Sequence, residues 1–120
     1  MEEEKLNFEK LEVYQKTLQF VGKIYTITKT FPKEERYGLI DQLRRASVSI
    51  LANIAEGSGR YHKNDMIQFL RIARSSGFEC IALLQISNEQ KYIVDIEYSK
   101  LYKDIQEITK MISGFINSIK

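Results

Sequence analysis

All six arginines of the chain lie between residues 36 and 74, whereas the other basic residues are lysines. A guanidinium group is planar and offers paired donors that match the oxygens of a phosphate or a carboxylate. Residues 29–74 carry nine Lys or Arg against five Asp or Glu, a local excess of four in a chain of net charge +2. This concentration predicts a surface that binds RNA or DNA phosphates. Its candidate residues are Arg36, Arg44, Arg45, Arg60, Lys63, Arg71 and Arg74.

The same arginines have a second interpretation. Asp41, Glu56 and Asp65 lie in the same stretch and are available as ion-pair partners, within one chain or between subunits. Arginine is also enriched in ordinary protein interfaces. The residues thus leave two functions open: a nucleic-acid-binding surface, or a structural, protein-interaction ring whose arginines serve subunit contacts only.

The segment NIAEGSGR at residues 53–60 combines glycines, a carboxylate and an arginine, a composition that can hold an anion on backbone N–H groups. It lacks the Lys-Ser/Thr ending and the preceding strand of a P-loop. We therefore favour a structural turn, in which Gly57 ends a helix and Glu56 pairs with an arginine. Asn53, Glu56 and Gly57 form this predicted turn.

No residues suggest catalysis, a cofactor or a metal site, so we expect a non-enzymatic protein. The one histidine, His62, and the one cysteine, Cys80, are too few for a zinc site. Helical periodicity buries Cys80, which excludes an exposed Cys–His pair, and we expect His62 at the surface where a helix begins. Tyr37 and Tyr61 flank the arginines; they either stack on unpaired bases or pack at the ends of a bundle.

The elements that position these residues are predicted to be four helices. With 43% apolar and 28% charged residues, one proline and few glycines, the chain is typical of a globular, all-α protein. Helices are expected over residues 8–30, 32–57 and 63–87, with the last beginning near residue 95. They predict one domain over residues 1–120, an antiparallel up-down-up-down four-helix bundle whose residues 1–7 are frayed.

Apolar residues spaced by threes and fours predict the core faces. The first helix would bury Leu11, Tyr14, Leu18, Val21, Tyr25 and Thr28. The second would bury Leu39, Leu43, Ala46, Ile50 and Ile54. In the third helix, Gly77 lies within the stripe, which indicates close approach of a neighbouring helix.

Several apolar residues fall beside these stripes and predict contact with another copy of the chain. They are Val48, Leu51, Ala55, Ile67 and Phe78. The acidic N-terminus lacks an apolar stretch, so we expect no signal or transit peptide, no membrane association and a cytoplasmic location.

Four motifs carry a resemblance to a known family: FPKEERYGL at residues 31–39, QLRRA at 42–46, NIAEG at 53–57 and FLRIA at 69–73. The chain resembles the bacterial four-helix-bundle proteins named for intervening sequences of 23S ribosomal RNA genes. The family's motif positions fall here on Arg44, Arg45, Asn53, Glu56, Gly57, Arg60 and Arg71.

The resemblance implies a small antiparallel bundle that assembles as a ring-like homopentamer. The family is similar to the accessory variability protein of diversity-generating retroelements, also a pentameric bundle, whose basic surface binds nucleic acid and a reverse transcriptase. We therefore expect a homopentamer whose arginine surface binds structured RNA or DNA, or a protein partner. His62 stands where the family usually has a helix-capping serine, and Tyr14 where a tryptophan is common.

Overall fold

The computed structural model describes residues 6–120, and these residues form four long α-helices. The helices are α1 (Glu12–Thr28), α2 (Leu39–Ser58), α3 (Lys63–Glu89) and α4 (Asp95–Ile119), with short 3-10 helices at Asn7–Lys10 and Lys33–Glu35. The predicted all-α, four-helix fold class is confirmed. The predicted fraying of residues 1–5 lies outside the described residues, while Asn7, also expected to fray, begins the first 3-10 helix.

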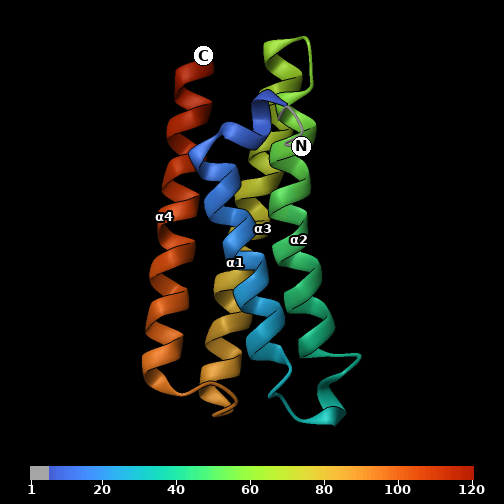
Figure 1. Cartoon of the computed structure of the whole chain (residues 1–120), viewed down its shortest axis with the longest axis vertical. Helices are drawn as coiled ribbons and strands as arrows, with labels where there is room; N and C mark the ends of the chain where they lie inside the picture. Colours follow the sequence, from blue (N-terminus) through green and yellow to red (C-terminus); the bar gives the residue numbers. More distant parts are fainter. Residues whose placement is uncertain (1–5) are drawn as a thin grey trace, which may run out of the picture.

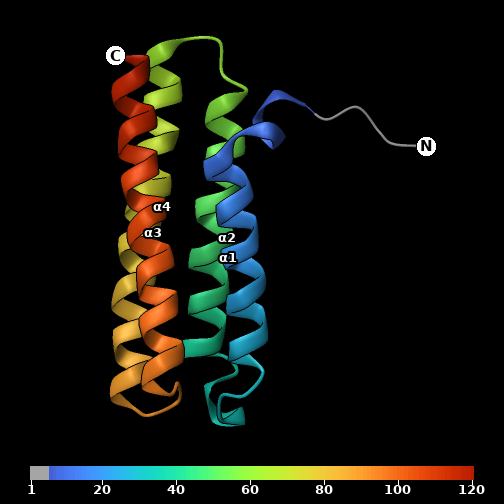
Figure 2. The same cartoon turned by 60° about the vertical axis from the view of Figure 1, so that its left-hand side comes forward.

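The helices pack lengthwise, and each contacts two others: α1 and α3 both lie against α2 and α4. The chain runs down α1, up α2, down α3 and up α4 in Figure 1, and Figure 2 shows the pairs α1/α2 and α3/α4 beside one another. Only four residues, 59–62, connect α2 to α3. None of the helices between residues 6 and 120 has the length and apolar content that crossing a membrane requires.

A continuous apolar core runs between the four helices. Its fully buried large apolar side chains are Phe20, Ile24, Leu43, Ile50, Ile54, Leu70, Leu84, Ile105, Ile108 and Ile112. The predicted core face of α2 is confirmed, because all five of its residues are buried. On α4 the buried residues are Leu101, Ile105, Ile108, Thr109, Ile112 and Ile116.

The predicted core face of α1 is wrong except at Thr28, which is buried as expected. The buried residues are Val13, Thr17, Phe20, Ile24 and Thr28, whereas Leu18 is 51% exposed and Tyr25 is 40% exposed. The two buried threonines are Thr17, which the prediction left out, and Thr28, which it included. Their hydroxyls donate to the carbonyls of Val13 and Ile24, both at 2.7 Å, so the buried polar atoms are satisfied within the helix.

Helix ends also differ from the predictions. The predicted first helix breaks at Leu11 between a 3-10 helix and α1, and Pro32 precedes a 3-10 turn instead of opening α2. Gly57 does not end α2, which continues to Ser58. Gly57 is buried because α3 passes close by: an added Cβ would lie 3.1 Å from the Met66 carbonyl oxygen.

Gly77 marks the close approach predicted for α3. A Cβ at this position would lie 2.7 Å from Cγ2 of Thr109 on α4, closer than van der Waals contact allows. The glycine therefore sets the distance between α3 and α4.

Candidate nucleic-acid interface

Arg44 is engaged inside the chain. Its Nε donates to Oγ1 of Thr28 at 2.9 Å and its Nη2 to the Tyr25 carbonyl at 3.3 Å, and its guanidinium lies 4.6 Å from the centre of the Tyr25 ring. Arg44 is half-buried and joins α2 to the last turn of α1, where a positive charge is favourable. This candidate therefore has a structural role.

Arg60 and Arg74 also have partners within the chain. Arg60 donates to Glu56 Oε2 at 3.1 Å, and its guanidinium lies 4.5 Å from the centre of the Phe69 ring. Arg74 donates from Nη1 to Ser113 Oγ at 3.2 Å, which links α3 to α4. Both side chains hold helices together, although Arg60 also stays exposed at the end of the bundle.

The other four candidates are exposed. Arg45 is on α2 with its side chain 81% exposed, and its one ion pair, to Asp41, is also at the surface. None of the ion pairs between residues 6 and 120 includes Arg36, Lys63 or Arg71. These four positions extend from Arg36, just before α2, to Arg71 in the first third of α3, so the basic residues are spread along the chain and form no compact cluster.

Asn53, Glu56 and Gly57 all lie within α2, so the predicted turn is wrong, while Glu56 pairs with Arg60 at 3.1 Å. Asn53 Nδ2 donates to the Ser49 carbonyl at 2.8 Å and to Ser49 Oγ at 3.2 Å. Ser49 Oγ is in turn 2.8 Å from Ser76 Oγ on α3. The Ser49–Ser76 contact therefore joins α2 to α3, and Asn53 bonds to Ser49 from within α2; sequence spacing could not reveal this contact, because it links two helices.

The remaining reactive and aromatic residues fall into two environments. Cys80 is buried, and burial raises the pKa of its thiol to about 12, with a further contribution from Glu79. His62 immediately precedes α3 at the surface, as predicted, and makes no side-chain cap hydrogen bond. Tyr37 and Tyr61 are 86% and 93% exposed, so neither packs at a bundle end.

The apolar residues proposed for subunit contact divide into two groups. Phe78 is 54% exposed and Val48 is also exposed, while Leu51 and Ala55 are half-buried. The prediction that Ile67 contacts another subunit is wrong, because its side chain is 8% exposed and belongs to the chain's own core. Helix α3 packs against both α2 and α4, so it buries a wider arc of its surface than a single stripe. Leu18, Tyr25, Ile72 and Ile86 are exposed as well, although the sequence predicted none of them as surface for subunit contact.

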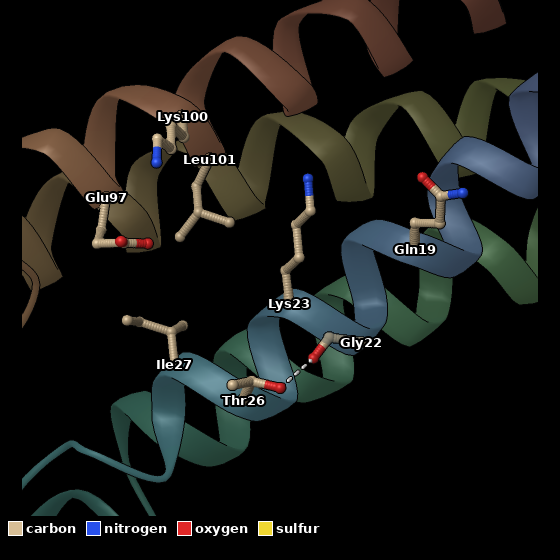
Figure 3. A pocket seen from close by; sticks show the side chains of 8 residues that line it. All are labelled: Gln19, Gly22, Lys23, Thr26, Ile27, Glu97, Lys100 and Leu101. Carbon is tan, nitrogen blue, oxygen red and sulfur yellow. Dashed lines mark hydrogen bonds between the residues drawn. The ribbon is translucent and has the colours of Figure 1, made fainter.

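A groove of about 530 Å³ between α1 and α4 was not foreseen. Ile27 and Leu101 point towards one another across it in Figure 3, and Lys23, Glu97 and Lys100 lie around them. Lys23 Nζ is 2.8 Å from Asp104 Oδ2, so this lysine already has a partner. Within residues 6–120, no three His, Cys, Asp or Glu side chains gather as metal ligands would.

Comparisons with known proteins agree with this fold. A crystal structure of a protein of unknown function from the S23 ribosomal protein family of Bacteroides thetaiotaomicron VPI-5482 matches with a TM-score of 0.79 and 27% identity, over 87% of this chain and 97% of that one. No curated protein sequence matches. Residues 9–114 match the family described as 23S rRNA-intervening sequence protein, which confirms the resemblance seen in the motifs. The chain therefore belongs to the 23S rRNA-intervening sequence protein family.

Proposed function

We propose that this chain is a non-enzymatic, oligomeric adaptor that binds RNA or DNA through exposed basic side chains of α2, α3 and the segments beside them. The observation that carries the proposal is the spacing of Arg36, Arg45, Lys63 and Arg71. Arg36 precedes α2 and Lys63 follows it, and a helix of 20 residues is about 30 Å long. One small anion cannot reach groups this far apart, whereas the repeated phosphates of a nucleic acid can.

The neighbouring carboxylates do not neutralise this surface strongly. The Arg45–Asp41 pair on α2 and the Arg60–Glu56 pair at the end of α2 both join residues four apart in the sequence and are open to solvent. Exposed pairs of this kind contribute only about 0.2–1 kcal/mol and weaken with salt. A polyanion can therefore replace the carboxylates as the partner of these arginines.

Assembly is the second part of the proposal. We infer that antiparallel four-helix bundles join as a ring-like homopentamer through exposed apolar residues such as Val48 and Phe78. Exposed apolar surface on a small protein favours contact with another chain. A ring would repeat the basic residues around its axis, so that a modest charge excess on each chain sums over the assembly.

A non-enzymatic role agrees with the state of the reactive groups. The Cys80 thiol is buried with a raised pKa, so its thiolate is neither formed near neutral pH nor open to a substrate. His62 is exposed at the start of α3, and between residues 6 and 120 there is no buried carboxylate that could orient it as a base.

The test is binding of labelled structured RNA and duplex DNA across a salt series, with the mass of the assembly followed by light scattering. We expect the logarithm of the affinity to fall linearly with the logarithm of the salt concentration, with a slope of about 0.9 per neutralised duplex phosphate. Replacing both Arg45 and Arg71 by glutamine should reduce this slope by about two for duplex DNA, because each substitution removes one phosphate contact. Neither residue holds helices together, so the fold should persist.

The matched control replaces two exposed lysines on α4, Lys103 and Lys110, by glutamine and removes the same charge. This variant should keep the wild-type slope. Absence of binding at roughly 50 mM salt, where phosphate contacts are strong, would overturn the nucleic-acid proposal. An intact assembly that binds no nucleic acid would leave the protein-interaction ring as the function.

A further inference from the structure

The connection between α2 and α3 presents an aromatic pair at the end of the bundle. Residues 59–62 form this short loop, visible in yellow-green at one extremity of Figure 1. Tyr61 is almost fully exposed and His62 next to it is also exposed. A tyrosine usually buries a large apolar area, so a tyrosine ring left in water favours a role in contacting a partner.

The geometry of the pair leaves ring faces open. The Tyr61 and His62 ring centres are 5.1 Å apart with the planes at 88°, an edge-to-face contact. In such a contact the edge of one ring covers one face of the other ring. Each ring then limits the movement of its neighbour, and the ring faces outside the contact stay accessible. Aromatic faces of this kind stack on unpaired bases, irrespective of base identity.

Basic groups flank the aromatic pair. Arg60, held in place by Glu56 and the Phe69 ring, precedes it, and Lys63 follows it as the first residue of α3. Glu56 and Asp65 lie nearby and balance these charges, so net attraction is small here. Stacking, with Arg60 and Lys63 contacting adjacent phosphates, is therefore the interaction that this loop can supply.

We propose that Tyr61 and His62 form a stacking platform for unpaired bases, so that the nucleic acid bound by this protein is single-stranded or contains an unpaired loop. The proposal rests on the nucleic-acid binding proposed above and names the kind of nucleic acid. In a base-paired duplex the base faces are already stacked on one another, and this platform cannot reach them.

Tyr37 provides a matched control. It is also highly exposed, at the opposite end of α2, but its ring lies beside the Arg36 guanidinium, 5.5 Å from the ring centre, where Tyr61 has the ring of His62. Tyr61 and Tyr37 therefore share residue type and exposure and differ in their surroundings.

The experiment compares a single-stranded oligonucleotide carrying a fluorescent base analogue with a blunt duplex of the same sequence, using the full chain. Tyr61→Ala should lower affinity for the single strand by roughly 5- to 100-fold, the loss expected when stacking on one base is removed. It should also abolish the fluorescence change caused by stacking, and leave duplex affinity unchanged. Tyr61→Phe and Tyr37→Ala should behave as wild type.

The outcomes separate this inference from the function on which it rests. If the wild-type protein binds neither probe, both proposals fail. If it binds the duplex with a steep salt dependence and Tyr61→Ala binds the single strand as tightly as wild type, only the stacking platform is wrong. An equal loss for both probes, or an equal loss in Tyr37→Ala, would also overturn the platform.

Discussion

Arg44 and Thr28 are joined by a 2.9 Å hydrogen bond that ties α2 to the last residue of α1. The same guanidinium donates to the Tyr25 carbonyl, one of the carbonyls of the last helical turn. The carbonyls of the last turn carry the partial negative charge of the helix dipole, so a cation beside them is stabilising. Arg44, a candidate for nucleic-acid binding in the sequence, thus holds α2 against the end of α1.

Arg44→Ala should lower the free energy of unfolding by about 1–3 kcal/mol, because it removes hydrogen bonds from a charged, half-buried group. Urea unfolding followed by circular dichroism measures the change. Arg45→Ala is the control, since its exposed ion pair predicts a change of less than about 1 kcal/mol. Equal destabilisation by the two variants would contradict the structural role of Arg44.

Gly77→Ala should destabilise the protein although alanine is the better helix former by about 1 kcal/mol. The added Cβ would overlap Cγ2 of buried Thr109, and overpacking of this kind costs about 1–3 kcal/mol. Thr109→Ser, which removes that methyl group, should restore part of the stability in the double variant. Gly114→Ala is the control: its Cβ meets nothing within 4 Å, so thermal unfolding should show no loss of stability.

Phe78→Ser should weaken self-assembly and leave the folded bundle intact, because this exposed ring contributes to the surface proposed for subunit contact. Light scattering would report a lower mass at unchanged helix content. Ile67→Ser provides the contrast: it places a hydroxyl in the core and should lower the unfolding midpoint. A Phe78→Ser protein with wild-type mass would exclude this ring from the interface.

The α1–α4 contact should depend on pH. Lys16 donates a 2.9 Å ion-pair hydrogen bond to Glu107, which lowers the pKa of Glu107 below its ordinary value of 4.5 and raises that of Lys16 above 10.5. The ion pair therefore contributes fully to folding stability between about pH 4.5 and pH 10.5, the ordinary pKa values of the two groups. Its contribution disappears as pH falls through the folded-state pKa of Glu107, or rises through that of Lys16.

Comparing wild type with Glu107→Gln in urea at several pH values measures this window. The stability difference should be constant near neutral pH and shrink below pH 4.5, and 1 M salt should reduce it, because the pair is exposed. A difference that persists unchanged in acid would mean that Glu107 acts through packing.

The sequence alone determined the all-α, four-helix architecture and the core face of α2. These follow from the spacing of apolar residues such as Leu43, Ile50 and Ile54, a local property that persists in any helix packed on one side. The close approach at Gly77 could also be inferred, because a glycine inside an apolar stripe weakens its helix and leaves room for a neighbouring one.

The tertiary structure decided which residues were already engaged. Thr17 lies in the core of α1, where its hydroxyl bonds to its own helix, and Ile67 is buried because α3 has neighbours on two sides. Arg44 and Arg74 bond across helices, whereas Arg45 and Tyr61 face solvent. Such differences depend on which helices lie side by side, and residues far apart in sequence make those contacts.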